Sequence, residues 1–308
     1  MFVFSLLFLV LLILFLYSGY KYADLFFSYR HNPKEGKRKF LTSPDKKQVL
    51  TYDEEFFKKH DFQEVTVKSK DGLNLKGHLL IENSSHRYIL SVHGYRGNYK
   101  ELSHQCRYLN EELGYSLLMI EQRAQGSEGK YITFGYKERE DVLVWAEYLV
   151  SNDPKAQIVL YGFSMGAATV LMASSLPLPK NVKGIVADSS YVSTRNELAY
   201  VGKRKYGKEY FWISASSRFA AFFLAHFSYT RYTPLKSVKK DTLPLLLIHG
   251  NKDTYVPFSD FETLKKNVPS STYLSTFVGK GAWHGMSFLV DPEGYRNALR
   301  SFLKDCVK

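Results

Sequence analysis

Three side chains in the second half of the chain have the types and the order needed for acyl transfer through a serine. In the segment 157–168, QIVLYGFSMGAA, an apolar strand-like run turns sharply at Ser164 into Ala-rich, helix-forming sequence. Gly162 and Gly166 flank the serine, as expected where any Cβ would collide with neighbouring backbone. This pattern is typical of a nucleophile elbow, which holds a serine hydroxyl clear of a sheet. A Gly-rich turn with an incidental serine would have the same pattern.

The hydroxyl of such a serine needs a general base within hydrogen-bond reach, and the base needs an orienting carboxylate. Asp253 follows an apolar run that ends at Gly250, and His284 lies between the last predicted strand and the last predicted helix. Taken singly, Asp253 could cap the helix that starts near Ser259, and His284 could be a surface histidine. Their order after Ser164 is the one expected on a parallel sheet. The sequence therefore predicts a nucleophile, an acid and a base at Ser164, Asp253 and His284.

Acyl transfer also needs two preorganised hydrogen-bond donors for the oxyanion. The backbone N–H of Met165, at the start of the helix after the nucleophile, is one candidate. The other is the N–H of Tyr95, because the loop after the first parallel strand supplies the second donor on such sheets. In that loop, HGYRGN at 93–98, His93 is expected to be structural. Arg96 is expected either to meet a substrate carboxylate or to be solvated, and solvation is favoured.

The elements that must position these residues follow a regular alternation. Short apolar runs are separated by segments with helical periodicity. The predicted strands are 62–68, 75–81, 88–94, 115–121, 157–163, 182–188, 244–250 and 272–278. The predicted helices are 53–60, 99–113, 136–151, 165–176, 258–268 and about 291–305. Asp71-Gly72 favours a hairpin between the first two strands. The pattern predicts a mainly parallel, eight-stranded sheet with helices on both faces, and ligands bind beyond the carboxyl ends of its strands.

One long interval breaks this alternation. About 50 residues separate Ser190 from Leu243, where the sheet needs a single helix. The remainder predicts a small cap insertion at about 191–235. Its apolar stretch 211–227, FWISASSRFAAFFLAHF, suits either a cap over the site or a core crossover helix, and the sequence does not choose between them.

The N-terminal segment 2–20 has no charged side chain and would form a helix roughly 28 Å long, close to the hydrocarbon thickness of a bilayer. A cleaved signal peptide is the alternative, but a basic n-region and a small-x-small cleavage site are both lacking. We expect a retained anchor at 1–20, a basic linker at 21–60 and a globular domain at 61–308. The basic residues that follow the anchor closely are Lys21, Arg30, Lys34, Lys37, Arg38 and Lys39. This bias favours a cytoplasmic globular domain.

The composition narrows the class of protein further. The 308 residues are 45% hydrophobic, which fits a globular protein, and carry a net charge of +12. Basic charge can indicate nucleic acid, but no RNA-binding motif, zinc finger or helix-turn-helix pattern accompanies it, so the expected partner is the membrane surface. Cys106 and Cys306 have no spacing typical of a disulfide framework or a metal site. Without phosphate-loop, dinucleotide or HExxH motifs, we expect no cofactor.

Several segments together resemble the α/β-hydrolase superfamily, over about residues 62 to 305. They are GFSMG, HGYRGN, EQRAQGSEG, ITFGYKEREDV and HGNKDTYVP. The chain looks most similar to membrane-anchored, mostly bacterial serine hydrolases of the Bem46-like or serine-aminopeptidase-like type. The resemblance implies an α/β-hydrolase fold and repeats the roles given above to the three triad candidates and to the two oxyanion donors. The sequence departs from the family pattern at Glu121 and Gln125, where Asp and His are usual.

The sequence thus predicts a membrane-anchored serine hydrolase that cleaves carboxylic esters through an acyl-enzyme. An ester of a lipid or another partly apolar acid is expected, because the anchor keeps the site near the bilayer and 211–227 could form an apolar lid. Two alternatives remain, which are a peptidase or amidase and a catalytically silent binding protein on the same fold.

Overall fold

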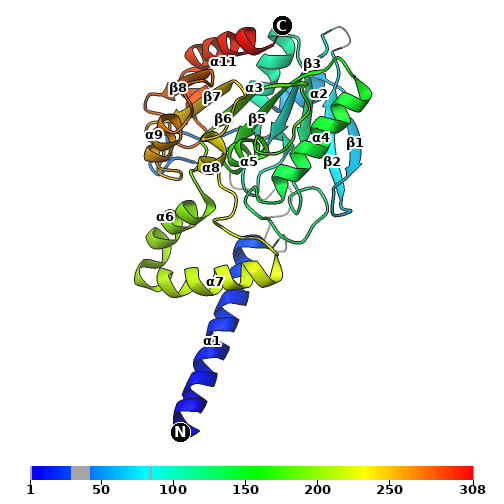
Figure 1. Cartoon of the computed structure of the whole chain (residues 1–308). Helices are drawn as coiled ribbons and strands as arrows, with labels where there is room; N and C mark the ends of the chain where they lie inside the picture. The colour runs from blue at the N-terminus through cyan, green and yellow to red at the C-terminus, as the bar shows by residue number, and fades with distance from the viewer. Residues whose placement is uncertain (1, 29–41, 83–84, 308) are drawn as a thin grey trace.

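The computed structural model describes residues 2–28, 42–82 and 85–307, and these form one eight-stranded sheet with helices on both faces (Figure 1). The strand order is β1-β2-β4-β3-β5-β6-β7-β8. The strands are β1 (Gln63–Lys68), β2 (Asn74–Leu80), β3 (Arg87–Val92), β4 (Ser116–Ile120), β5 (Gln157–Phe163), β6 (Val182–Asp188), β7 (Leu245–Gly250) and β8 (Leu274–Gly279). Neighbouring strands are antiparallel at β1–β2 and β2–β4 and parallel elsewhere. The mainly parallel, eight-stranded prediction is confirmed.

Two layers of helices bury the two faces of the sheet. Along β5, Ile158 and Leu160 face one layer, whereas Val159 and Tyr161 face the other, as the two-residue period of a strand requires. The first layer contains α4 (Glu138–Asn152), α5 (Met165–Ala173), α8 (Pro234–Val238) and α9 (Phe258–Lys266). The second contains α2 (Glu54–Lys59), α3 (Ser103–Arg107), the π-helical turn η3 (Tyr108–Glu112), α10 (Ser287–Val290) and α11 (Pro292–Cys306). The 3-10 turn η2 (Tyr99–Leu102) precedes α3.

The interval after β6 folds into helices that lie outside these layers. They are α6 (Thr194–Tyr206), the 3-10 turn η4 (Gly207–Glu209) and α7 (Tyr210–Leu224). The short helix α8 packs on α5 beside the sheet and makes the crossover to β7. Since α7 packs on the N-terminal helix and not on the sheet, the stretch 211–227 is a cap element, and the crossover alternative is wrong.

The N-terminal helix α1 (Phe2–Phe27) continues past residue 20, where the predicted anchor ended, and its end packs into the globular domain. Most of α1 extends away from the domain, and α7 crosses α1 toward the C-terminal end of α1 (Figure 1). Gly19 lies against the backbone of Ser216, and the hydroxyls of Ser18 and Ser216 are 3.2 Å apart. Within the described residues, one helix is long and apolar enough to cross a membrane, from Phe4 to Phe27. The basic residues Arg30 to Lys39 of the predicted linker lie outside the described residues.

Candidate active site

Ser164 lies at a strained turn between β5 and α5. Its backbone has φ 54° and ψ −116°, a conformation that few non-glycine residues adopt and that often marks functional sites. A Cβ at Gly162 would collide with the Gly166 carbonyl, and a Cβ at Gly166 would collide with the Val92 carbonyl. The two glycines are therefore needed for the tight turn. The Ser164 N–H donates to the Asp188 carbonyl at 2.8 Å, which ties the turn to β6.

The three residues predicted to act together are joined by hydrogen bonds. The Ser164 hydroxyl lies 2.9 Å from His284 Nε2, and His284 Nδ1 lies 2.6 Å from Asp253 Oδ2. All three side chains are buried. The rings of Phe163 and Tyr255 pack around the imidazole, with centroids 5.2 and 5.1 Å away. The arrangement orients the serine hydroxyl toward a base that an acid holds in place, which is the geometry needed for nucleophilic attack.

Asp253 is held by more than His284. Its Oδ1 accepts the backbone N–H groups of Tyr255 and Val256 at 2.8 and 2.9 Å. A second histidine, His249, places Nε2 3.3 Å from Oδ2. Burial alone would raise the pKa of the Asp253 carboxyl, but the nearby imidazoles of His284 and His249 outweigh it and hold that pKa well below its usual value. Asp253 is therefore a carboxylate at neutral pH. His249 was not predicted, although it ends an apolar strand.

The two predicted oxyanion donors both lie at the cavity that Ser164 lines. Met165 is the first residue of α5, so its N–H is one of those without an acceptor inside the helix. The Tyr95 side chain stacks on Phe134 at 5.1 Å between ring centroids, and its hydroxyl donates to the Phe26 carbonyl at 2.7 Å. The end of α1 therefore contacts the loop that carries the second predicted donor.

Arg96, expected to be solvated or to meet a substrate carboxylate, is partly buried beside the end of α1. Its guanidinium donates to the Leu25 carbonyl of α1 at 2.6 Å and lies over the Tyr95 ring at 5.1 Å. The sequence did not indicate this contact between the 93–98 loop and the end of α1. His93 is structural, as predicted. It is buried, and its Nε2 accepts the Gln122 N–H at 3.1 Å.

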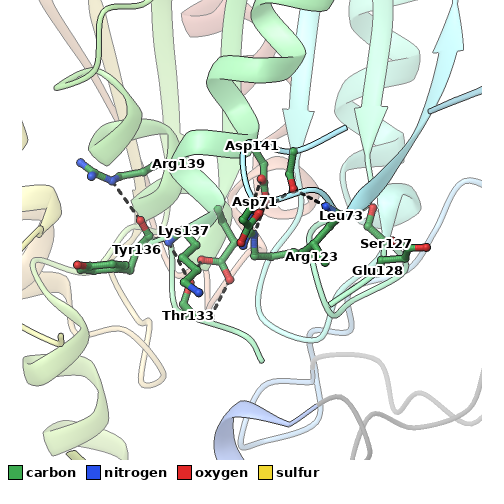
Figure 2. Close-up of polar contacts among 12 residues, drawn as sticks. Asp71, Leu73, Arg123, Ser127, Glu128, Thr133, Tyr136, Lys137, Arg139 and Asp141 are labelled. Carbon is green, nitrogen blue, oxygen red and sulfur yellow. Dashed lines mark hydrogen bonds and ion pairs between the residues drawn. The ribbon is translucent and has the colours of Figure 1, made fainter. Parts of the chain in front are cut away.

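The loop after β4 is hydrogen-bonded to the 93–98 loop. Gln125, which stands where the family usually has His, accepts the backbone N–H of Arg96 at 2.5 Å. Figure 2 shows Arg123 of the same loop between two carboxylates, Asp71 of the hairpin turn and Asp141 of α4. The guanidinium nitrogens donate to Asp141 at 2.6 Å and to Asp71 at 2.8 and 3.0 Å. This loop is thus fixed to three elements, even though Gln125 departs from the family pattern.

Two buried acids near the site were not predicted. Glu197 of α6 lines the cavity beside Ser164, and neither of its carboxylate oxygens has a hydrogen-bond partner within the described part of the chain. Burial raises the pKa of Glu197 well above its usual value. Asp188, at the end of β6, accepts the hydroxyl of Tyr295 at 2.6 Å, and burial raises its pKa. Its position at the end of an apolar strand was the one sequence signal for Asp188. Glu197 lies in the cap insertion, for which no helix was predicted at its position.

This geometry agrees with that of known proteins. The Hydrolase_4 family model, serine aminopeptidase S33, matches residues 83–236. The uncharacterized protein YqkD of Bacillus subtilis is 25% identical over 253 residues, 81% of each chain. The uncharacterized membrane protein YNL320W of Saccharomyces cerevisiae is 23% identical over 270 residues, 87% of this chain and 85% of its own. The Pyrococcus furiosus esterase Pf2001 superimposes with a TM-score of 0.67 at 25% identity, over 83% of this chain and 96% of its own.

The family match covers half of the chain and includes the elbow and the 93–98 loop. The structural likeness to an esterase covers 83% of this chain. The chain therefore belongs to the serine aminopeptidase S33 family of the α/β-hydrolase superfamily and is a serine hydrolase.

Proposed function

We propose that this hydrolase cleaves carboxylic esters through an acyl-enzyme on Ser164. The hydrogen-bonded relay from Ser164 through His284 to Asp253 is the observation that carries the proposal. The Ser164 hydroxyl attacks the ester carbonyl while His284 takes its proton. The N–H groups of Met165 and Tyr95 stabilise the oxyanion. His284 then gives the proton to the leaving alcohol, and water releases the acid by the same route. Asp253 orients the imidazole and stabilises its charged form.

A fluorophosphonate probe and a soluble ester, p-nitrophenyl acetate, test this proposal on the full-length protein in detergent. Wild type should be labelled and should turn over the ester. Ser164→Ala should lose labelling and about 10⁶-fold in kcat, because the nucleophile is gone. Most of the activity remaining in Ser164→Ala, or folded wild type that is neither labelled nor active, would contradict the proposal.

An aminopeptidase or amidase is the second candidate. The description of the family favours it, and so does Glu197, whose buried carboxyl group lines the cavity and would ionise beside a substrate ammonium group. Comparing an aminoacyl p-nitroanilide with p-nitrophenyl acetate separates the two. A higher kcat/KM for the anilide would replace the ester proposal, and a higher value for the ester would support it.

We also propose that α1 anchors the protein in a membrane with the hydrolase domain on the cytoplasmic side. The apolar length of α1 and the basic residues that follow it in the sequence support this orientation. Protease added to sealed, right-side-out vesicles should leave the C-terminus intact, and cleavage there would place the domain outside.

A further inference from the structure

Two apolar cavities lie one after the other between Ser164 and the cap. The first, about 80 Å³, lies beside Ser164 and is walled by Tyr95, Phe134 and Tyr255 among others. The second lies between α1, α6 and α7. Phe26, Leu198 and Val201 line both cavities, so the two cavities are neighbours with a shared wall. Together they extend from Ser164 to the place where α1 meets α6 and α7.

The exposed, apolar part of α1 indicates where a bilayer would lie relative to the second cavity. Residues 4–14 of α1 are exposed on every side, and the first charged residue is Lys21. The helix α7 meets α1 through Phe15, Ser18 and Gly19, only one to two turns before Lys21. If a bilayer covers the apolar part of α1, α7 lies at the interface between the lipid and water. The second cavity, which α7 lines, then lies at the depth of that interface.

The surface of α7 has the composition of an interfacial helix. One side carries large exposed side chains, Phe211, Trp212, Phe219, Phe222 and Phe223, with Phe211 82% exposed. The end of α6 and the turn η4 beside it carry a cluster of exposed basic residues, Lys203, Arg204, Lys205 and Lys208. Aromatic side chains at the acyl boundary and basic side chains at anionic headgroups are the two contributions that hold a helix in a membrane interface.

We propose that the two cavities form one acyl-chain site that opens into the bilayer, so that the substrate is a membrane-lipid ester whose chain enters between α6 and α7. The inference rests on the proposed ester hydrolase function and adds the class of substrate and its route. The ester carbonyl lies at Ser164, and the chain extends past Val201 toward the lipid. The exposed side of α7 is covered by the lipid surface, which is continuous with the surface around α1.

Filling the junction between the cavities tests the chain site. Val201→Trp places a large ring there, and it should lower the ratio of kcat/KM for a dodecanoyl ester to that for an acetyl ester of the same alcohol. The decrease should be about tenfold or more, because each methylene excluded from an apolar pocket has a substantial effect on kcat/KM. Leu198→Trp is the second variant, and fluorophosphonate labelling identifies folded enzyme. If labelled variants keep the wild-type ratio, the acyl-chain site is refuted.

The membrane route is tested with enzyme reconstituted in phosphatidylcholine–phosphatidylglycerol vesicles that contain a fluorogenic long-chain diacyl ester. The double variant Phe222→Glu/Phe223→Glu should hydrolyse this lipid about tenfold more slowly, relative to soluble p-nitrophenyl acetate, because two rings no longer partition into the interface. Ile81→Glu is the matched control. It is 46% exposed and follows β2, the strand that runs opposite to its neighbours, so it lies away from the cap.

The outcomes separate the two proposals. Wild type that hydrolyses the acetate ester but not the lipid ester in vesicles overturns the inference and leaves the ester hydrolase function intact. The same conclusion follows if Phe222→Glu/Phe223→Glu and Ile81→Glu lower the relative lipid rate equally. Wild type that hydrolyses neither ester contradicts the proposed function itself.

Discussion

At the scale of single residues, the site combines two carboxyl groups in opposite environments. Asp253 has two backbone N–H donors and two imidazoles around it, so its charge is well compensated. Glu197 lines the cavity that Ser164 lines, but it has no partner within the described residues. A buried carboxyl without a partner avoids ionisation, and burial accordingly raises the pKa of Glu197 well above its usual value. Asp253 is therefore suited to orient the charged imidazole, whereas Glu197 adds a neutral polar group to an apolar wall.

The raised pKa of Glu197 makes stability depend on pH. The pKa of Glu197 in the unfolded chain is the ordinary one, about 4, whereas in the folded protein it is raised. Between these two pKa values the folded protein binds a proton that the unfolded chain lacks, so the free energy of unfolding decreases as pH rises. Glu197→Gln removes this decrease. The variant should match wild type at about pH 4 and be more stable at about pH 8 by roughly 1–3 kcal/mol, the range for a buried unsatisfied group. Denaturant unfolding in detergent at both pH values measures the difference, and an equal difference at the two values would contradict the explanation.

The proximity of Ser164, Asp253 and His284 was predictable from sequence, whereas the groups around them were not. Asp253 and His284 follow strands whose carboxyl ends must meet at one edge of a parallel sheet, so chain order alone brings them to Ser164. Glu197 lies on a helix whose position depends on packing against α7 and α1, and no local pattern sets that packing. The contact of Arg96 with Leu25 joins segments 71 residues apart in the chain and was missed for the same reason.

At the scale of elements, the 121–141 segment links the hairpin, the sheet and the oxyanion loop. Arg123 binds Asp141 of α4 and Asp71 of the β1–β2 turn, while Gln122 and Gln125 of the same loop bond to His93 and to the backbone of Arg96. The sequence predicted the hairpin and α4 from their local patterns. It did not predict that one arginine joins them, because an ion pair between distant segments leaves no periodic signal.

Removing Arg123 tests this link. Arg123→Ala should lower the free energy of unfolding by about 3–5 kcal/mol, because it leaves the buried Asp141 carboxylate without its counterion. The Asp141 side chain is 4% exposed, whereas that of Asp71 is 47% exposed. Asp71→Asn should therefore lower the free energy of unfolding by no more than about 1 kcal/mol, because solvent screens this pair. Denaturant unfolding of both variants checks this order, and equal losses would mean that burial of the pair does not matter.

At the scale of the whole molecule, the N-terminal helix is both a candidate anchor and a part of the catalytic domain. Its outer part, residues 4–14, is exposed on every side. In its last turn, Ala23 and Phe27 are buried in a cluster with cap residues and with Met165, next to the nucleophile. The carbonyls of Phe26 and Phe27 accept the Tyr95 hydroxyl and the Ile132 N–H, both at 2.7 Å. The boundary between the candidate anchor and the globular domain therefore lies within the helix.

Two truncations should separate these roles. Deleting residues 4–14 removes only exposed helix, so the detergent-solubilised enzyme should keep its kcat/KM for p-nitrophenyl acetate. Deleting residues 2–28 also removes the acceptors of Tyr95 and Arg96, and kcat/KM should fall by about 10²-fold, because a small displacement of an oxyanion donor has an effect of that order. Fluorophosphonate labelling and circular dichroism identify folded protein in both cases. If both deletions hydrolyse the acetate ester equally well, α1 serves only to hold the enzyme at the membrane, and the oxyanion loop keeps its conformation without it.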